Sequence, residues 1–224
     1  MSVSTASTTD RHTRDAVEKE LDWTRQVEDS ANIGVAVHDG VVTLSGEVSS
    51  YSQKVTAAKT ALRVRGVNAV ANHLLVRYPG SKRMDAEIAE AASKILGWTE
   101  GVPAGSVKLD VRDRAAYLSG VVDWDYQRRA ARRAVENLAG IEGVFDRMTL
   151  NARTSASETG SMVKGAILRN AVVDARSVTV DVEGTKVILH GQVSSNAERK
   201  QAELAAWSSP HVTEVENRII IRTP

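Results

Sequence analysis

Hydrophobic and polar residues alternate with a period of two in three stretches of the chain, and each stretch ends at a glycine. The stretches are IGVAVHDGVVTLSG ending at Gly46, VKLDVRDRAAYLSG ending at Gly120, and VTVDVEGTKVILHG ending at Gly191. When the three glycines are aligned, the apolar positions coincide column by column. Such alternation predicts strands with one buried face, and the polar break in the middle of each stretch predicts a turn. The chain therefore contains three copies of a β-hairpin.

The segment after each hairpin also repeats. Side-chain oxygens are available where a helix would begin, from Ser49 and Ser50, from Asp123, and from Ser194 and Ser195. Gly66 and Gly140 suit the left-handed residue that ends a helix. Each copy then returns to alternation, which predicts a last strand.

One column of that last strand is polar although it falls in the inward-facing row. It holds Asn72, Asp146 and Asn217. We expect these side chains to hydrogen-bond to backbone groups near the start of the strand, with contact to a ligand as the alternative.

A helical stretch precedes each hairpin. The predicted ranges are 15–24, 85–97 and 158–170. The repeating unit is therefore helix, strand, strand, helix, strand. A small sheet that is apolar on one side buries that side most simply under both helices. We therefore predict an α+β protein of three tandem αββαβ modules over residues 10–78, 82–152 and 157–224, each a three-stranded mixed sheet with two helices packed on one face.

Charge and composition exclude several classes of function. The chain has 29 basic and 28 acidic residues, balanced within each predicted module, whereas a duplex-binding protein needs uncompensated cations. There is no cysteine for thiol chemistry or for a Cys-based metal site. No stretch approaches the roughly 20 apolar residues of a membrane-spanning helix. The first residues lack an apolar run of signal-peptide length, so we expect a cytoplasmic protein, or a periplasmic one if a leader has been removed.

Candidate catalytic and metal-binding groups are sparse. The histidines lie apart along the chain, without a partner at the spacing of a metal-binding helix face. Asp123 and Asp125 could form a carboxylate pair for acid/base work, but their place at a predicted helix start favours capping. We therefore expect no catalytic site, metal or cofactor.

The helix after the second hairpin differs from its two counterparts by concentrating positive charge. Its arginines cover an arc of about 140° on a helix of 3.6 residues per turn, with Trp124 and Tyr126 at its start. This face is a candidate surface for anionic lipid or for a partner protein. The alternative is a solvated helix face whose arginine stems cover the sheet edge, with Trp124 in the core. The residues concerned are Arg128, Arg129, Arg132, Arg133 and Trp124.

Two tryptophans occupy matching places in the first two copies. Trp23 and Trp98 each lie two residues after a leucine of the first helix, Leu21 and Leu96, and Asn170 is expected at this place in the third copy. We expect both rings to pack against the helix end.

The repeated motifs resemble those of the BON domain. They are the strand VTLSG, a helix, and then G-V-x-x-V-x-N-x-L from Gly66 to Leu74, repeated as GIEGVFDRM and HVTEVENRI. The resemblance extends from about residue 10 to the end of the chain, and three such modules are similar to the osmotically inducible OsmY-like proteins of bacteria. The resemblance implies a non-enzymatic, stress-associated protein with phospholipid-binding modules.

Two other functions are consistent with the sequence. Exposed sheet faces or helix grooves could hold client proteins under osmotic stress, in a chaperone-like role. A small-ion sensor is suggested only because a potassium-binding protein also carries a BON module. The expected partner is thus an anionic phospholipid surface or a client protein and not nucleic acid, and the sequence does not define the oligomeric state.

Overall fold

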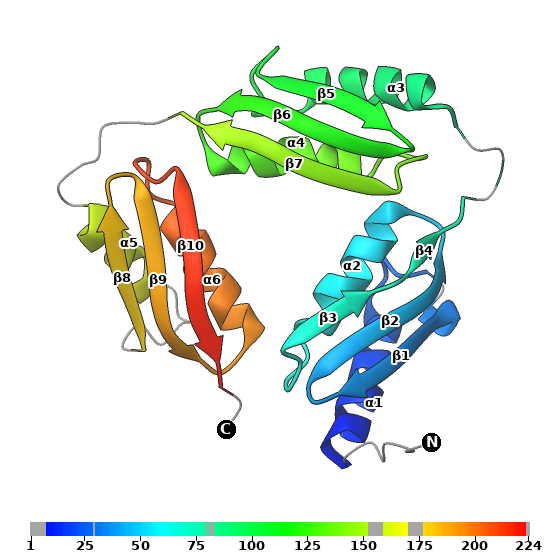
Figure 1. Cartoon of the computed structure of the whole chain (residues 1–224), viewed down its shortest axis with the longest axis horizontal. Helices are drawn as coiled ribbons and strands as arrows, with labels where there is room; N and C mark the ends of the chain where they lie inside the picture. Colours follow the sequence, from blue (N-terminus) through cyan, green and yellow to red (C-terminus); the bar gives the residue numbers. More distant parts are fainter. Residues whose placement is uncertain are drawn as a thin grey trace. The chain divides into compact units, whose positions relative to one another are not determined.

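The structure, a computed structural model of the whole chain, describes residues 8–28, 30–78, 80, 83–151, 159–169 and 177–222. They form three αββαβ modules, each with a three-stranded mixed sheet and two helices (Figure 1). In every module both helices lie on one side of the sheet. This arrangement confirms the predicted α+β class. The other side of each sheet is called its open face below.

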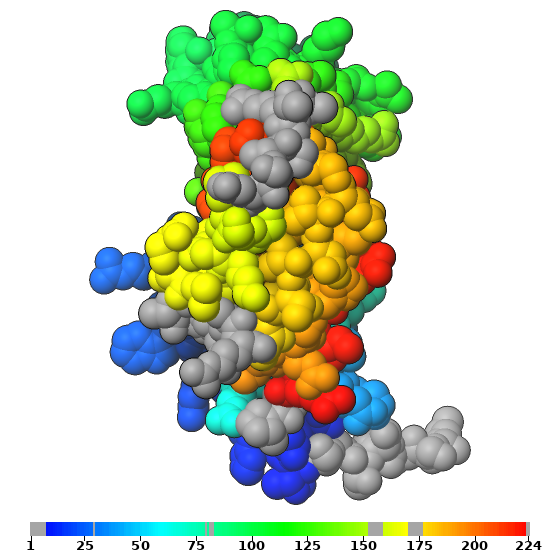
Figure 2. Space-filling view, turned by 90° about the vertical axis from the view of Figure 1, so that its left-hand side faces the viewer, coloured from blue at the N-terminus to red at the C-terminus, as the bar shows by residue number. Residues whose placement is uncertain are grey.

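The first module contains α1 (Thr8–Trp23), a short 3-10 helix η1 (Ser30–Asn32), β1 (Ile33–His38), β2 (Val41–Val48), α2 (Tyr51–Ala61), β3 (Ala69–Asn72) and β4 (Leu75–Val76). The second contains α3 (Asp85–Trp98), β5 (Val107–Arg112), β6 (Ala115–Val122), α4 (Asp125–Glu136) and β7 (Gly143–Leu150). The third contains α5 (Thr159–Leu168), β8 (Val178–Glu183), β9 (Lys186–Val193), α6 (Asn196–Trp207) and β10 (Glu214–Ile221). In the third module α5 lies alongside β8 at the surface (Figure 2).

Each sheet has the second hairpin strand at its centre. The hairpin partners are antiparallel, and the last strand pairs with the central strand in parallel. In the first module the last strand is interrupted between Asn72 and Leu75. Both of its segments, β3 and β4, keep one register against β2, so they act as a single strand.

The core of each module lies between the sheet and its two helices. In the first module Val42, Leu44 and Val48 of β2 are buried against Val17 and Leu21 of α1. The corresponding residues of the other two modules are buried in the same way. Removing each such aliphatic side chain from water contributes about 1.5–3 kcal/mol.

The first helix begins earlier than its sequence pattern predicts. It starts at Thr8 instead of residue 15. The apolar stripe begins only at Val17, whereas the first two turns bury the polar side chains of Asp10 and Thr13. A search for apolar periodicity therefore misses these turns. For the first helix of the third module, the predicted end at residue 170 lies outside the described residues.

The three glycines that aligned the repeats have a common structural role. Gly46, Gly120 and Gly191 adopt φ values of +113°, +124° and +125°. A Cβ atom on each would lie 2.0, 2.1 and 1.9 Å from the backbone carbonyl oxygen of the residue that precedes the first hairpin strand. Both the positive φ and this close approach exclude a side chain. Gly66 and Gly140 are also left-handed, as predicted, with φ of +89° and +101°.

Candidate functional site

The arginines of α4 lie beside carboxylates of their own module. Arg128 lies 2.6 Å from Asp125 Oδ1 and 3.8 Å from Asp146 Oδ2. Arg129 Nε lies 2.7 Å from Asp125 Oδ2. The guanidinium carbon of Arg128 is also 4.7 Å from the centroid of the Trp207 ring. These two cations therefore stabilise a buried acid of their own helix.

Arg132 makes a similar pair. Its Nε lies 2.7 Å from Glu136 Oε1, and the Glu136 side chain is only 8% exposed. Arg133 is exposed, and no ion pair to it occurs within the described ranges. Three of the four arginine charges are thus matched locally, which leaves Arg133 as the one free cation of this predicted surface among the described residues.

The start of α4 differs from the predicted capping arrangement. The N-cap position belongs to Trp124, whose side chain makes no cap hydrogen bond and is half-buried. Asp123, the predicted cap, accepts a hydrogen bond from Asn151 Nδ2 at 2.6 Å, and Gln127 Oε1 accepts from the amides of Asp123 and Trp124. The capping prediction is therefore wrong for Asp123. It is confirmed for Ser50 and Ser195, whose hydroxyls accept from amides of the first helical turn.

Asp123 and Asp125 do not converge on a reaction site. Asp123 binds Asn151, whereas Asp125 is buried against Arg128 and Arg129. Hydrogen bonds and ion pairs within the module explain both carboxylates.

The polar column of the last strands bonds to the backbone, as predicted. Asn72 Nδ2 donates to the carbonyl oxygen of Lys54 in α2, and its Oδ1 accepts from the Leu74 amide. Asn217 makes the same two bonds in the third module. Asp146 cannot donate, so it retains the bond from the strand amide and lies near the Arg128 side chain. This column fastens the second helix of each module to the sheet.

The prediction that Trp23 and Trp98 pack against the helix end is wrong. They are the last residues of α1 and α3, and they are 85% and 83% exposed. Leu21 and Leu96, two residues earlier, are the ones that enter the core. Because a helix turns by about 100° per residue, a residue two positions later points away from the face that Leu21 or Leu96 occupies. In the third module the buried counterpart is Ile167, so Arg169 takes the place of the tryptophans instead of Asn170.

A further exposed aromatic residue lies beside the loop that follows α3. Tyr126, on the first turn of α4, is 53% exposed. A Cβ atom on Gly101, three residues after Trp98, would lie 3.1 Å from its ring. Trp98 and Tyr126 therefore lie at the same end of the second module. The sequence predicted a binding surface at the arginines in the middle of α4. The exposed aromatic rings lie instead at the helix ends.

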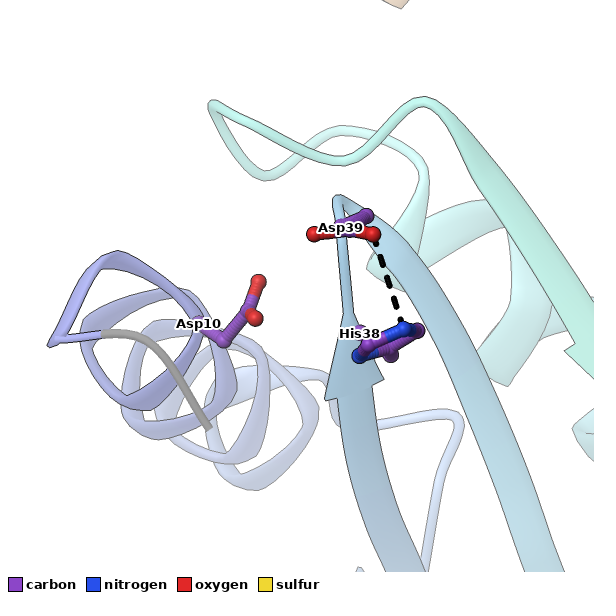
Figure 3. A group of neighbouring side chains, drawn as sticks. All are labelled: Asp10, His38 and Asp39. Atoms are coloured by element: carbon purple, nitrogen blue, oxygen red, sulfur yellow. Dashed lines mark ion pairs between the residues drawn. The ribbon is translucent and has the colours of Figure 1, made fainter. Parts of the chain in front are cut away.

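One group of side chains has donor atoms suited to a metal ion. Asp10, His38 and Asp39 each offer a ligand atom, and these atoms lie within 4.8 Å of one another (Figure 3). His38 Nε2 is 3.5 Å from Asp39 Oδ2. His38 and Asp39 are exposed, whereas Asp10 is buried.

The second module suggests a structural reason for this proximity. Asp85 has the same position in α3 as Asp10 has in α1, eleven residues before the buried leucine. Its two carboxylate oxygens accept hydrogen bonds, each 2.9 Å long, from the amides of Asp113 and Arg114 in the hairpin turn. An acid at the start of the first helix that faces the hairpin turn is therefore common to both modules. The group does not by itself indicate a metal.

In the described part of the chain, every helix is too short or too polar to cross a membrane.

Comparison with known proteins agrees with the repeated architecture. The family model described as "BON domain" matches residues 9–78, 84–152 and 155–223. Osmotically-inducible protein Y of Escherichia coli (strain K12) is 34% identical over 121 residues, which cover 51% of this chain and 60% of that protein. The match thus spans less than two thirds of the relative's length.

Two solved structures are more distant. CdsD, described as a structural protein of the Type III secretion system of Chlamydia trachomatis, aligns with a TM-score of 0.28 and 10% identity over 93% of this chain and 91% of that one. The PrgH periplasmic domain aligns with a TM-score of 0.22 and 9% identity over 91% and 98%. Likenesses this weak support no conclusion about this chain. The three segments that match the family model do support a conclusion. With three tandem copies of the domain, the chain belongs to the BON domain family.

Proposed function

We propose that this chain is a non-enzymatic protein that associates reversibly with phospholipid surfaces through Trp23 and Trp98. The observation that carries the proposal is their exposure, 85% and 83%, at the same position of two modules. Indole rings combine a large apolar surface with one polar N–H group, so they partition into the interface between lipid headgroups and acyl chains. An exposed ring at a helix end can enter that layer without disturbing the core of its module.

The arginines of α4 have a secondary role in this proposal. Each uncompensated cation near an anionic leaflet contributes about 1 kcal/mol. Arg128, Arg129 and Arg132 have carboxylate partners, which reduces their attraction for lipid phosphates. Arg133 is therefore the main cation of α4 available for this role. We expect aromatic insertion to dominate, with a modest preference for anionic lipid.

The expected strength follows from the buried area. A tryptophan can bury about 150–250 Å², and apolar burial contributes about 25 cal/mol per Å². A ring that inserts by a third to a half of this area contributes about 1.5 kcal/mol or more, which is about tenfold in partitioning. Two such rings give binding that is reversible and sensitive to single substitutions.

Vesicle co-sedimentation of the full chain tests the proposal. Trp98→Ala and Trp23→Ala should each weaken binding to phosphatidylglycerol vesicles about tenfold, and the double variant should abolish it. Phe145→Ala is the matched control, because it removes an exposed ring from the sheet of the second module, away from the helix ends. It should bind as the unaltered chain does.

Arg133→Gln should have a smaller effect than either tryptophan variant. Equal binding by the double tryptophan variant would overturn the proposal. If the unaltered chain fails to sediment with vesicles yet suppresses the aggregation of an unfolding enzyme, the client-binding alternative replaces it. The expected cytoplasmic location is a separate prediction, which is tested by fractionating cells that express the natural gene.

A further inference from the structure

The open faces of the second and third modules carry opposite charge. On the second, the exposed residues of β5 and β7 include three cations, Lys108, Arg112 and Arg147, and one anion, Asp110, a formal net charge of +2. The third module has four anions and two cations on its open face, a net charge of −2. These six residues are Asp181, Glu183, Glu214, Glu216, Lys186 and Arg218.

The open face of the second module is also aromatic. Tyr117 of β6 and Phe145 of β7 stack with their centroids 4.8 Å apart and an interplanar angle of 11°. The guanidinium carbons of Arg147 and Arg112 lie 5.3 and 6.0 Å from the centroid of Tyr117. Phe145 is 50% exposed. The corresponding positions hold Thr43 and Ala71 in the first module and Ile188 and Glu216 in the third.

The ring geometry favours a protein partner over a nucleic acid. Neighbouring strands are about 4.8 Å apart, so two rings stacked at that spacing stand upright on the sheet with their edges outward. Nucleobases stack on the faces of aromatic rings, and one face of each of these two rings is covered by the other ring. The edges carry the positive part of the ring quadrupole. With the arginines beside them, they suit carboxylates set among apolar side chains.

The open face of the third module has that composition. Asp181 and Glu216 flank Ile188 on the two neighbouring strands, where Ile188 is 6% exposed, and Ile220 of β10 is 59% exposed. Asp181 lies 3.4 Å from His190, Glu216 is bonded to Lys186 and Arg218, and Glu214 lies 3.0 Å from Lys186, so the four carboxylates share two cations and the face keeps a net charge of −2. The surplus positive charge of the second module lies with Lys108 and Arg147.

We propose that the occupant of the aromatic face in the second module is the open face of the third module in a second copy of this chain. Two identical open faces would repel each other because they carry the same charge. The second module of one copy therefore contacts the third module of the next, head to tail, and the outer copies each keep one free face. A three-stranded face offers less than the roughly 800 Å² per partner of a standard interface. The association is therefore weak, dependent on concentration and weakened by salt.

Sedimentation velocity of the full chain without lipid tests this inference. At low ionic strength the unaltered chain should shift from monomer to larger species as its concentration rises, and added salt should reverse the shift. A cationic-face variant, Lys108→Glu with Arg147→Glu, and an acidic-face variant, Asp181→Lys with Glu183→Lys, should each associate at least about tenfold more weakly, because all their open-face contacts join like charges.

Mixing the two variants provides the sharpest readout. Each variant alone carries the same sign on both faces, whereas the mixture again offers opposite faces, so a one-to-one association should return. All four substituted side chains are exposed, so the variants should remain folded, which circular dichroism would check. Phe145→Ala should weaken association without any change of charge, and Trp98→Ala should leave it unaltered.

A chain that stays monomeric at every concentration and salt would overturn the inference. So would variants that associate as the unaltered chain does, or a mixture that stays monomeric. Association lost in Trp98→Ala would instead place the contact at the helix ends. Because this experiment contains no lipid, a chain that does not self-associate leaves the lipid proposal intact. A chain that does not bind vesicles likewise leaves the self-association proposal intact.

Discussion

At the residue scale, the most constrained positions of this chain are the glycines in the central strands. Gly120 has a φ of +124°, and any Cβ there would lie 2.1 Å from the carbonyl oxygen of Ser106. The chain entering the hairpin therefore crosses the central strand at backbone contact. The same contact occurs in all three modules, which explains why this glycine is the clearest repeated residue of the sequence.

Gly120→Ala should destabilise the second module by more than about 2 kcal/mol, because a left-handed non-glycine residue costs about 1–2 kcal/mol and the carbonyl contact adds to that cost. Hydrogen–deuterium exchange of the amides in β5 and β6 would show faster exchange. Gly97→Ala is the matched control, since Gly97 lies in α3 with open space around it. That substitution should be neutral or slightly stabilising. Equal protection of the hairpin amides in both variants would contradict this account.

Glu216 connects a single residue to the dependence of stability on pH. Hydrogen bonds from Arg218 and then from Lys186 lower the pKa of its carboxyl from 4.5 to about 2. Because the pKa is lower in the folded state, the stabilisation is fully present above about pH 4.5 and is lost as the pH falls toward 2. A carbon-detected NMR titration should show Glu216 ionised at pH 3. In Glu216→Gln the third module should unfold with a weaker dependence on pH in this window, and a midpoint near 4.5 for Glu216 would refute the assignment.

At the scale of elements, the first helix of the second module does more than cover the sheet. Asp85 opens α3 and binds the amides of Asp113 and Arg114, which both have positive φ, +49° and +60°. Non-glycine residues are strained in such a turn. The two charge-assisted bonds offset that strain and connect helix and hairpin. The sequence showed Asp85 only as one of several acids near a helix start, since its partners lie 28 and 29 residues away.

Asp85→Ala should therefore destabilise the second module by about 2–3 kcal/mol, because two turn amides lose an ionised acceptor. Glu87→Ala is a suitable comparison in the same helical turn, since Glu87 accepts a hydrogen bond from the nearby Met84 amide. It should cost about 1 kcal/mol or less. Urea denaturation followed by the near-ultraviolet signal of Tyr117 and its neighbours would measure both. A larger effect for Glu87→Ala than for Asp85→Ala would disprove the proposed link between helix and turn.

At the scale of the whole molecule, three copies of one framework carry different surfaces. The cores and the helix-fastening column are shared, whereas the helix ends and open faces differ from module to module. We propose that Trp23 and Trp98 contact lipid and that the open faces of the second and third modules contact each other between copies of the chain. The two proposals depend on separate residues. Trp98→Ala should weaken vesicle binding and leave self-association unaltered, whereas Phe145→Ala should do the reverse. A single variant that abolished both activities would show that the two surfaces are not independent.

The amino-acid sequence by itself determined the repeat, the hairpins, the α+β class, the key glycines and the polar column at Asn72. These features depend on local periodicity or on a backbone conformation that few residues tolerate, so neighbouring letters are enough to reveal them. Only the tertiary structure decided which polar side chains meet. It paired Asp125 with the arginines of α4, brought Asp85 to a distant turn, and left Trp23 and Trp98 in solvent. Burial and ion pairing depend on elements far away along the chain, and the period of a single helix does not show what lies opposite it.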